Sequence, residues 1–185
     1  TMKVVIKNVV VRFSDIFEAK EFKSGDGRPR FSASFLVEPG SENDKTIRAA
    51  IDAVMTGTWK DKAAAKTKAF MSQNGQSCYR DGNNMEYDGC AGNMVLAAHR
   101  QAQSGAPKIV DRAKNDLTKE SGKPYPGCVV NAVIDIWAQT GENPGIRATL
   151  NAVQFVKDGE PFVGSAATAD DLPDLAEGLD DDDLV

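Results

Sequence analysis

Residues 128–139, CVVNAVIDIWAQ, alternate apolar side chains with side chains of mixed polarity, and contain neither glycine nor proline. A period of two is typical of a strand that covers a core with one face. That face carries Cys128, Val130, Ala132, Ile134 and Ile136. The stretch predicts a long β-strand and favours a mainly β fold.

Other strand patterns precede and follow this stretch, at residues 2–13, 30–39, 93–100, 108–110 and 145–160. A glycine-rich segment at 23–30 predicts a hairpin loop between the first two. Helical spacing links Ile47, Ile51, Val54 and Met55 after a capping serine, Ser41, and good helix formers continue through residues 60–70. About six strands, one or two helices and long loop insertions predict a compact antiparallel barrel.

The charge of the chain is divided unevenly. The whole sequence has 22 basic and 27 acidic residues, a net charge of −5, and eight of the acids lie within residues 170–185, which contain no base. Residues 1–169 alone have 22 basic and 19 acidic residues, a net charge of +3. We therefore predict a folded domain over 1–169 and a disordered acidic tail over 170–185.

The sequence offers little for catalysis. His99 is the single histidine, and no local nucleophile, phosphate-loop or dinucleotide signature is present. Cys78, Cys90, His99 and Cys128 have the composition of a zinc site but not its spacing, and buried free cysteine is the favoured interpretation. We expect no enzyme, cofactor, metal or membrane span, and an odd number of cysteines fits a reducing compartment.

Basic and aromatic residues recur together in the predicted loops and helices. A groove for single-stranded nucleic acid needs cations along the phosphates and flat rings on which unpaired bases stack. The candidate phosphate contacts are Arg28, Arg30, Lys60, Lys62, Arg80 and Lys123. The candidate stacking residues are Phe22, Trp59, Tyr79 and Tyr125. Solvated lysines on a helix and aromatic residues in the core are the structural alternative for each of them.

The acidic tail has two interpretations. It is either a solubilising terminus, or a tethered mimic of polyphosphate that occupies a basic groove and is displaced by DNA. In the second case its end is a docking peptide for protein partners, with acids for steering and an aliphatic anchor. That peptide would comprise Asp180, Asp181, Asp182, Asp183, Leu184 and Val185.

Several stretches resemble a family of single-stranded-DNA-binding proteins of tailed phages. They include Tyr-Arg-Asp-Gly at 79–82, Val-Asp at 110–111, Tyr-Pro-Gly-Cys at 125–128 and LNAVQFVKDG at 150–159, and the resemblance covers most of residues 3–170. The family implies an OB-fold barrel, sequence-independent and cooperative binding with self-association along DNA, and a role in phage replication or recombination in the cytoplasm of the infected bacterium. Tails of this kind recruit replication proteins, but many end in an aromatic residue where this chain ends in Leu-Val.

Two other functions stay open from the sequence. One is a protein-interaction module without DNA binding, and the other is a zinc-dependent enzyme.

Overall fold

The computed structural model describes residues 1–21, 27–73 and 75–162. The predicted stacking residue Phe22 and the predicted tail, residues 170–185, lie outside this part. The described strands are β1 (Met2–Lys20), β2 (Arg30–Val37), β3 (Tyr79–Asp81), β4 (Met94–Gln101), β5 (Lys108–Val110), β6 (Val129–Gln139) and β7 (Gly145–Lys157).

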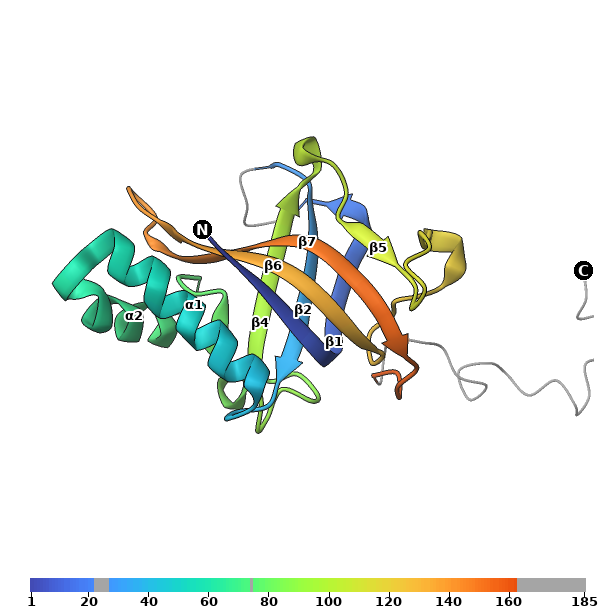
Figure 1. The fold of residues 1–185 in the computed structure, drawn as a ribbon, viewed down its shortest axis with the longest axis horizontal. Helices are drawn as coiled ribbons and strands as arrows, with labels where there is room; N and C mark the ends of the chain where they lie inside the picture. The colour runs from blue at the N-terminus through green and yellow to red at the C-terminus, as the bar shows by residue number, and fades with distance from the viewer. Residues whose placement is uncertain (22–26, 74, 163–185) are drawn as a thin grey trace, which may run out of the picture.

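Five of these strands close into a barrel in the order β1-β2-β4-β7-β6. The pairs β1–β2, β2–β4, β1–β6 and β6–β7 are antiparallel, whereas β4 meets β7 in parallel at His99 and Thr149. Figure 1 shows β6 and β7 crossing over β4, β2 and the second half of β1. The predicted mainly β barrel is confirmed, with the difference that its closing pair makes it mixed rather than fully antiparallel.

Strand β1 belongs to both sides of the barrel because it bends. Its first half pairs with β6 and its second half pairs with β2. The register with β6 shifts between Ile6 and Val9, where Asn8 has a φ of 56°. Asparagine tolerates this left-handed conformation better than most residues, so the bend is encoded locally.

Two helices follow β2 and lie to one side of the barrel (Figure 1). Helix α1 (Glu42–Trp59) begins after Ser41, whose hydroxyl accepts a hydrogen bond from the backbone N–H of Asp44. Its buried face contains the four apolar residues of the predicted periodicity, so the predicted helix is confirmed. The short 3-10 helix η1 (Lys60–Lys62) joins it to α2 (Ala63–Ser72). In the part of the chain that is described, no helix is long and apolar enough to cross a membrane.

The barrel core includes the face predicted from residues 128–136. Each of its five residues is at most 1% exposed: Cys128, Val130, Ala132, Ile134 and Ile136. Helix α1 adds its apolar stripe to the same core cluster. Both helices pack chiefly against strands other than β2 and β4, with α1 on β1 and β6 and α2 on β3 and β7.

Candidate nucleic-acid interface

The middle of the outer face of β2 and β4 has a floor of small side chains, with Leu36 and Val95 at one end and His99 towards the other. On β2, Phe31, Ala33, Phe35 and Val37 point into the core, so the alternate residues face outward. Residues paired across antiparallel strands share a face, and the register joins Ser32 to His99 and Ser34 to Ala97. We call the outward surface of these two strands, with the adjoining Phe13 and Asp15 of β1, the open face.

An exposed aromatic cluster lies at one end of the open face. Phe13 is 44% exposed and Tyr87 is 56% exposed, and their ring centroids are 5.1 Å apart with an interplanar angle of 85°. The guanidinium carbon of Arg12 lies 4.6 Å from the centroid of Phe13, 5.7 Å from that of Tyr87 and 4.3 Å from that of Phe162. We call these four residues the aromatic platform.

A β-bulge places the exposed ring of Phe13 beside the buried side chain of Arg12, which is only 8% exposed. The register with β2 runs from Val11–Phe35 to Phe13–Ser34, which leaves Arg12 as the extra residue. A bulge of this kind redirects side chains and increases the local twist. The backbone N–H of Phe13 donates to the hydroxyl of Ser34, and Nε of Arg12 donates to the carbonyl of Asp88 at 2.7 Å.

The polar segment after β3 folds into a fixed loop that carries Tyr87. Gly82 donates its N–H to the carbonyl of Asn93, and Asn83 accepts a hydrogen bond from Gly92. A Cβ on Gly82 would lie 2.0 Å from the carbonyl oxygen of Cys90, so only glycine fits at this crossing. The sequence predicted loops here, and their packing is what holds Tyr87 beside Phe13.

Three of the six predicted phosphate contacts border the open face. Arg30 pairs with Gln101 on β4 and Lys20 on β1, and Arg28 is exposed just before it in the β1–β2 connection. Arg80 on β3 pairs with Val95 on β4. These arginines already interact within the protein. DNA phosphates would therefore add to existing interactions or replace them.

His99 adds no positive charge to this face at neutral pH. The surrounding protein hinders hydration of the imidazolium, and the nearby Arg30 and Arg147 repel its charge. Together these effects lower the pKa of His99, so the neutral ring is favoured at pH 7.

Lys60, Lys62 and Trp59 belong to the helical layer. Both lysines are exposed in η1, between α1 and α2, on the side of the barrel shown at the left of Figure 1. Trp59 is half-buried and packs edge-on against Phe70, with ring centroids 5.5 Å apart. The structure does not bring these three predicted residues together with the open face.

Tyr79 is a core residue. Its side chain is 0% exposed, and its hydroxyl donates a 2.6 Å hydrogen bond to Oδ1 of Asp44. Burial, and then the hydrogen bond to Asp44, raise the pKa of Tyr79. Because neither face of the ring can reach a base, we remove Tyr79 from the candidate stacking residues.

Lys123 and Tyr125 lie in the connection before β6. Nζ of Lys123 is 4.8 Å from the centroid of Phe155, and the hydroxyl of Tyr125 donates to Oδ1 of Asp158 at 2.7 Å. Tyr125 is half-buried and lines a cleft of about 280 Å³ against the second half of β1. Both residues are therefore partly engaged within the protein while remaining accessible.

The cysteines do not assemble a metal site. Cys78, Cys90 and Cys128 are all buried, and burial raises the pKa of each thiol, that of Cys78 to about 12. Within residues 1–21, 27–73 and 75–162, no group of three or more His, Cys, Asp and Glu side chains could hold a metal ion. A buried thiol of raised pKa is a poor metal ligand and nucleophile.

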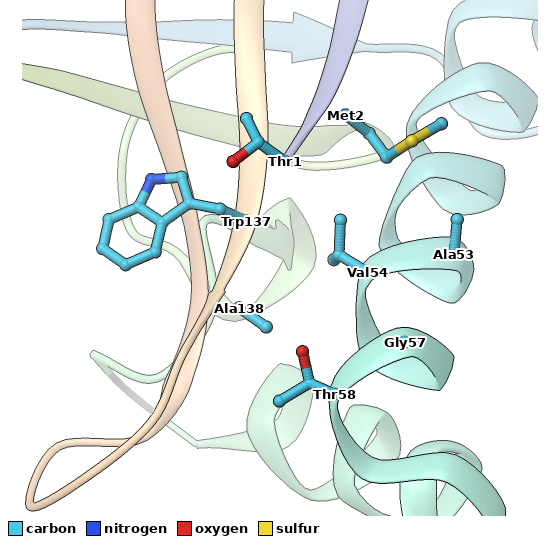
Figure 2. Close-up of a pocket in the computed structure, with 8 residues that line it drawn as sticks. All are labelled: Thr1, Met2, Ala53, Val54, Gly57, Thr58, Trp137 and Ala138. Atoms are coloured by element: carbon cyan, nitrogen blue, oxygen red, sulfur yellow. The ribbon is translucent and has the colours of Figure 1, made fainter.

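A larger hollow of about 430 Å³ lies between α1 and the beginning of β1. Figure 2 shows Thr58 and Ala138 facing each other across it, with the indole of Trp137 turned away from the helix. The indole N–H donates to the hydroxyl of Thr149. Among the described residues, no arginine or lysine lines this hollow, so this lining lacks the cations that a phosphate backbone requires.

Sequence reasoning missed Arg12, Phe13 and Tyr87. A usable signal was present for each: Arg12-Phe13 is an adjacent cation and aromatic ring at the end of a buried run, and Tyr87 lies in a polar loop. The exposure of the two rings is decided by the bulge and by the loop packing. Neither the bulge nor the loop packing can be predicted from the alternation of apolar and polar residues.

Comparisons with known proteins identify the family and the fold. Residues 2–185 match the model of a family described as "Enterobacter phage Enc34, ssDNA-binding protein". A "Putative protein p50" of Acyrthosiphon pisum secondary endosymbiont phage 1 is 35% identical over 179 residues, which is 95% of each chain.

Two solved structures share the fold. The single-stranded-DNA-binding protein of bacteriophage Enc34, in complex with ssDNA, is 22% identical with a TM-score of 0.71, over 86% of this chain and 89% of that one. The gp2.5 single-stranded-DNA-binding protein of bacteriophage T7 is 10% identical with a TM-score of 0.59, over 91% of this chain and 98% of that one.

Proposed function

Since this chain belongs to the family of the single-stranded-DNA-binding protein of Enterobacter phage Enc34, we propose that it coats single-stranded DNA through the open face and the aromatic platform. The family is one of DNA-binding proteins rather than enzymes. The role proposed for this chain is protection of single-stranded DNA during phage replication or recombination. Cooperative binding would need contacts between neighbouring copies along the strand.

The observation that carries this proposal is the exposed pair Phe13 and Tyr87 beside Arg12. Monomeric proteins rarely leave adjacent aromatic rings open to solvent without a use for them. Stacking of a base on an aromatic side chain contributes about 1–3 kcal/mol and does not depend on base identity. Arg12 is only 8% exposed, so its guanidinium supports the rings of Phe13, Tyr87 and Phe162 through cation–π contacts and does not itself reach a base.

The floor of the open face suits a strand of any sequence. Ser32 and Ala97 are too short to reach around a base and read its edge, and Ser34 is buried with its hydroxyl accepting a hydrogen bond from the backbone N–H of Phe13. Arg28, Arg30 and Arg80 are arranged around the floor rather than across it, which is where a phosphate backbone would run. We therefore expect affinity from stacking and phosphate contacts, with little sequence preference.

The part of the chain that leads into the acidic tail leaves the described structure at the platform. Phe162, the last described residue, lies over Arg12 and close enough to Gly89 that a Cβ there would come within 2.7 Å of the Phe162 ring. Residues 163–185 continue from this point and contain the eight clustered acids. Such a tether has a high effective concentration at the groove, so we propose that the tail competes with DNA.

Once DNA displaces the tail, its end becomes available to other proteins. Asp180, Asp181, Asp182 and Asp183 would steer a basic partner, and Leu184 and Val185 would enter an apolar pocket on it. Replication or recombination proteins of the phage or its host are the proposed partners.

Titration of a fluorescent oligo-dT at several salt concentrations tests the proposal. The double variant Phe13→Ala, Tyr87→Ala should bind about 30-fold or more weakly, because two stacked bases are lost. The control is Val5→Ala, since Val5 is 47% exposed on the first half of β1, away from the open face. Equal binding by the double variant and the control would place the DNA elsewhere.

A chain ending at residue 168 tests the role of the tail in the same assay. Truncation should tighten binding, most strongly at low salt, where the acids compete best with phosphates. If the intact chain and the truncated chain both fail to bind, DNA binding itself is rejected, and a protein-interaction module becomes the better description.

A further inference from the structure

The cleft beside Tyr125 lies on the same strand as the aromatic platform. It is bounded by the second half of β1 and by the connection around residues 119–126, and it has a volume of about 280 Å³. We propose that this cleft, the β1 cleft, receives one unstacked base of the strand that the platform holds. The inference rests on the proposed function and gives the bound DNA strand a second contact with the protein, separate from the platform.

The walls of the β1 cleft are flat and preformed. Phe17, Pro124, Tyr125 and Pro126 contribute rings to its lining. The hydroxyl of Tyr125 donates to Asp158 at 2.7 Å and accepts from the backbone N–H of Gly159 at 3.2 Å. A ring fixed in this way loses little freedom when a ligand arrives, so a base can bind without prior rearrangement.

The size of the cleft limits its occupant. Sites for drug-sized ligands measure about 300–1,000 Å³, and the β1 cleft lies just below that range. A single nucleobase is the part of a DNA strand that has matching size, flat shape and apolar faces.

Four of the residues that line the cleft are charged; we call their two ion pairs the mouth, and together they favour a base over a phosphate. Nζ of Lys20 lies 2.6 Å from Oδ1 of Asp15, and Lys119 pairs with Glu18. The bond to Lys119 lowers the pKa of Glu18, and the bond to Asp15 raises the pKa of Lys20, so each of these bonds favours the charged form of Glu18 or Lys20. With two positive and two negative charges, the mouth has no net charge with which to hold a phosphate inside.

The same lysines can serve the backbone that runs past the mouth. Lys20, Lys119 and Glu18 are exposed and Asp15 is half-buried, and ion pairs near the surface contribute little net stability. Each lysine can therefore turn from its carboxylate to a passing phosphate at small cost. The chemistry of the cleft therefore supports an arrangement in which one base lies inside it and the phosphates pass outside it.

The path from platform to cleft is short. Asp15, which lines the cleft, lies on the same face of β1 as Phe13 and two residues further along, and Phe17 is four residues from Phe13. Four residues of extended chain span at most about 14 Å. Even at the spacing of about 3.4 Å per nucleotide found in duplex DNA, about four nucleotides cover that distance. One bound strand can thus occupy both sites.

Photocrosslinking tests the assignment on the full chain. An oligo-dT with 5-iododeoxyuridine at single positions is bound, irradiated and mapped by mass spectrometry. We expect crosslinks to the platform, at Phe13 or Tyr87, and also to the cleft, at Phe17 or Tyr125. Crosslinks confined to the platform would overturn the inference and leave the proposed function intact. Absence of oligo-dT binding would reject both.

The ion pairs at the mouth give a second, independent test. Glu18→Gln should release Lys119 and tighten oligo-dT binding by a factor of up to about five. Lys119→Ala should weaken binding and make the salt slope shallower by about 0.7. The exposed pair Lys45–Glu42 on α1 provides the matched control, Lys45→Ala, which should change neither quantity. Cleft variants that behave like this control contradict the inference.

Discussion

The hydroxyl of Tyr79 donates a 2.6 Å hydrogen bond to Oδ1 of Asp44, which joins strand β3 to the first turn of helix α1. Asp44 is itself buried, and it accepts further hydrogen bonds from the backbone N–H of Gly40 and from Nε of Arg48. This network fixes the helix against the end of the barrel. It gives Tyr79 a structural role in place of the stacking role that composition suggested.

Replacing Tyr79 by Phe should therefore affect stability and not DNA binding. The change keeps the ring in the core but removes a donor to a buried carboxylate, which costs about 1–3 kcal/mol of unfolding free energy. Urea denaturation measures the loss, and oligo-dT titration of the folded variant should match wild type. A large loss of DNA affinity at unchanged stability would contradict the structural role and show that Tyr79 contributes to DNA binding.

The Asp44 network should also shape stability at acidic pH. Burial by itself would raise the pKa of Asp44, but hydrogen bonds from Tyr79, Gly40 and Arg48 outweigh it, and the pKa is lowered from 3.8. A carboxyl with a depressed folded pKa stabilises the protein above its unfolded pKa, and this contribution is lost as pH falls through the folded value.

The variant Asp44→Asn tests the direction in which the contribution of Asp44 to stability changes with pH. It should be less stable than wild type at neutral pH, and the difference in unfolding free energy should narrow as pH falls below about 4. Urea denaturation across that range provides the measurement. A difference that stays constant with pH would show that ionisation of Asp44 contributes nothing.

A pair of glycine substitutions tests whether packing of the loop that carries Tyr87 matters for DNA binding. Gly82→Ala should destabilise the protein by about 1–3 kcal/mol and weaken DNA binding, because its Cβ would meet the backbone of Cys90. Gly57→Ala in α1 has nothing within 4 Å of its Cβ, and should stabilise by up to about 1 kcal/mol. Thermal unfolding measures the stability of both variants, and oligo-dT titration measures their DNA affinity. Unchanged DNA affinity of Gly82→Ala would show that the loop is not part of the interface.

Two charge-matched double variants test which cations contact phosphates. Arg28→Gln with Arg80→Gln should make the salt slope of oligo-dT binding shallower by about 1.4, at about 0.7 per lost phosphate contact. Lys60→Gln with Lys62→Gln removes the same charge from the helical layer and should leave the slope nearly unchanged. Equal changes in slope would mean that the protein attracts DNA through net charge alone.

Local patterns predicted most of the elements. The alternation at 128–139 became β6, and the helical spacing of Ile47, Ile51, Val54 and Met55 became the buried face of α1. Period and capping are properties of adjacent residues, which is why a single sequence contains them. The parallel closure of β4 on β7 joins residues 50 positions apart, His99 and Thr149, and no local pattern specifies it.

The sequence by itself determined the alternating strands, the helix, the charge contrast between residues 1–169 and the terminal acids, and the resemblance to phage DNA-binding proteins. Only the tertiary structure decided which rings face solvent: it buried Tyr79 against Asp44, packed Trp59 on Phe70, and exposed Phe13 and Tyr87 around Arg12. The physical reason is that a ring's exposure depends on bulges, loop packing and partners distant in the chain, whereas composition records only that the ring is present.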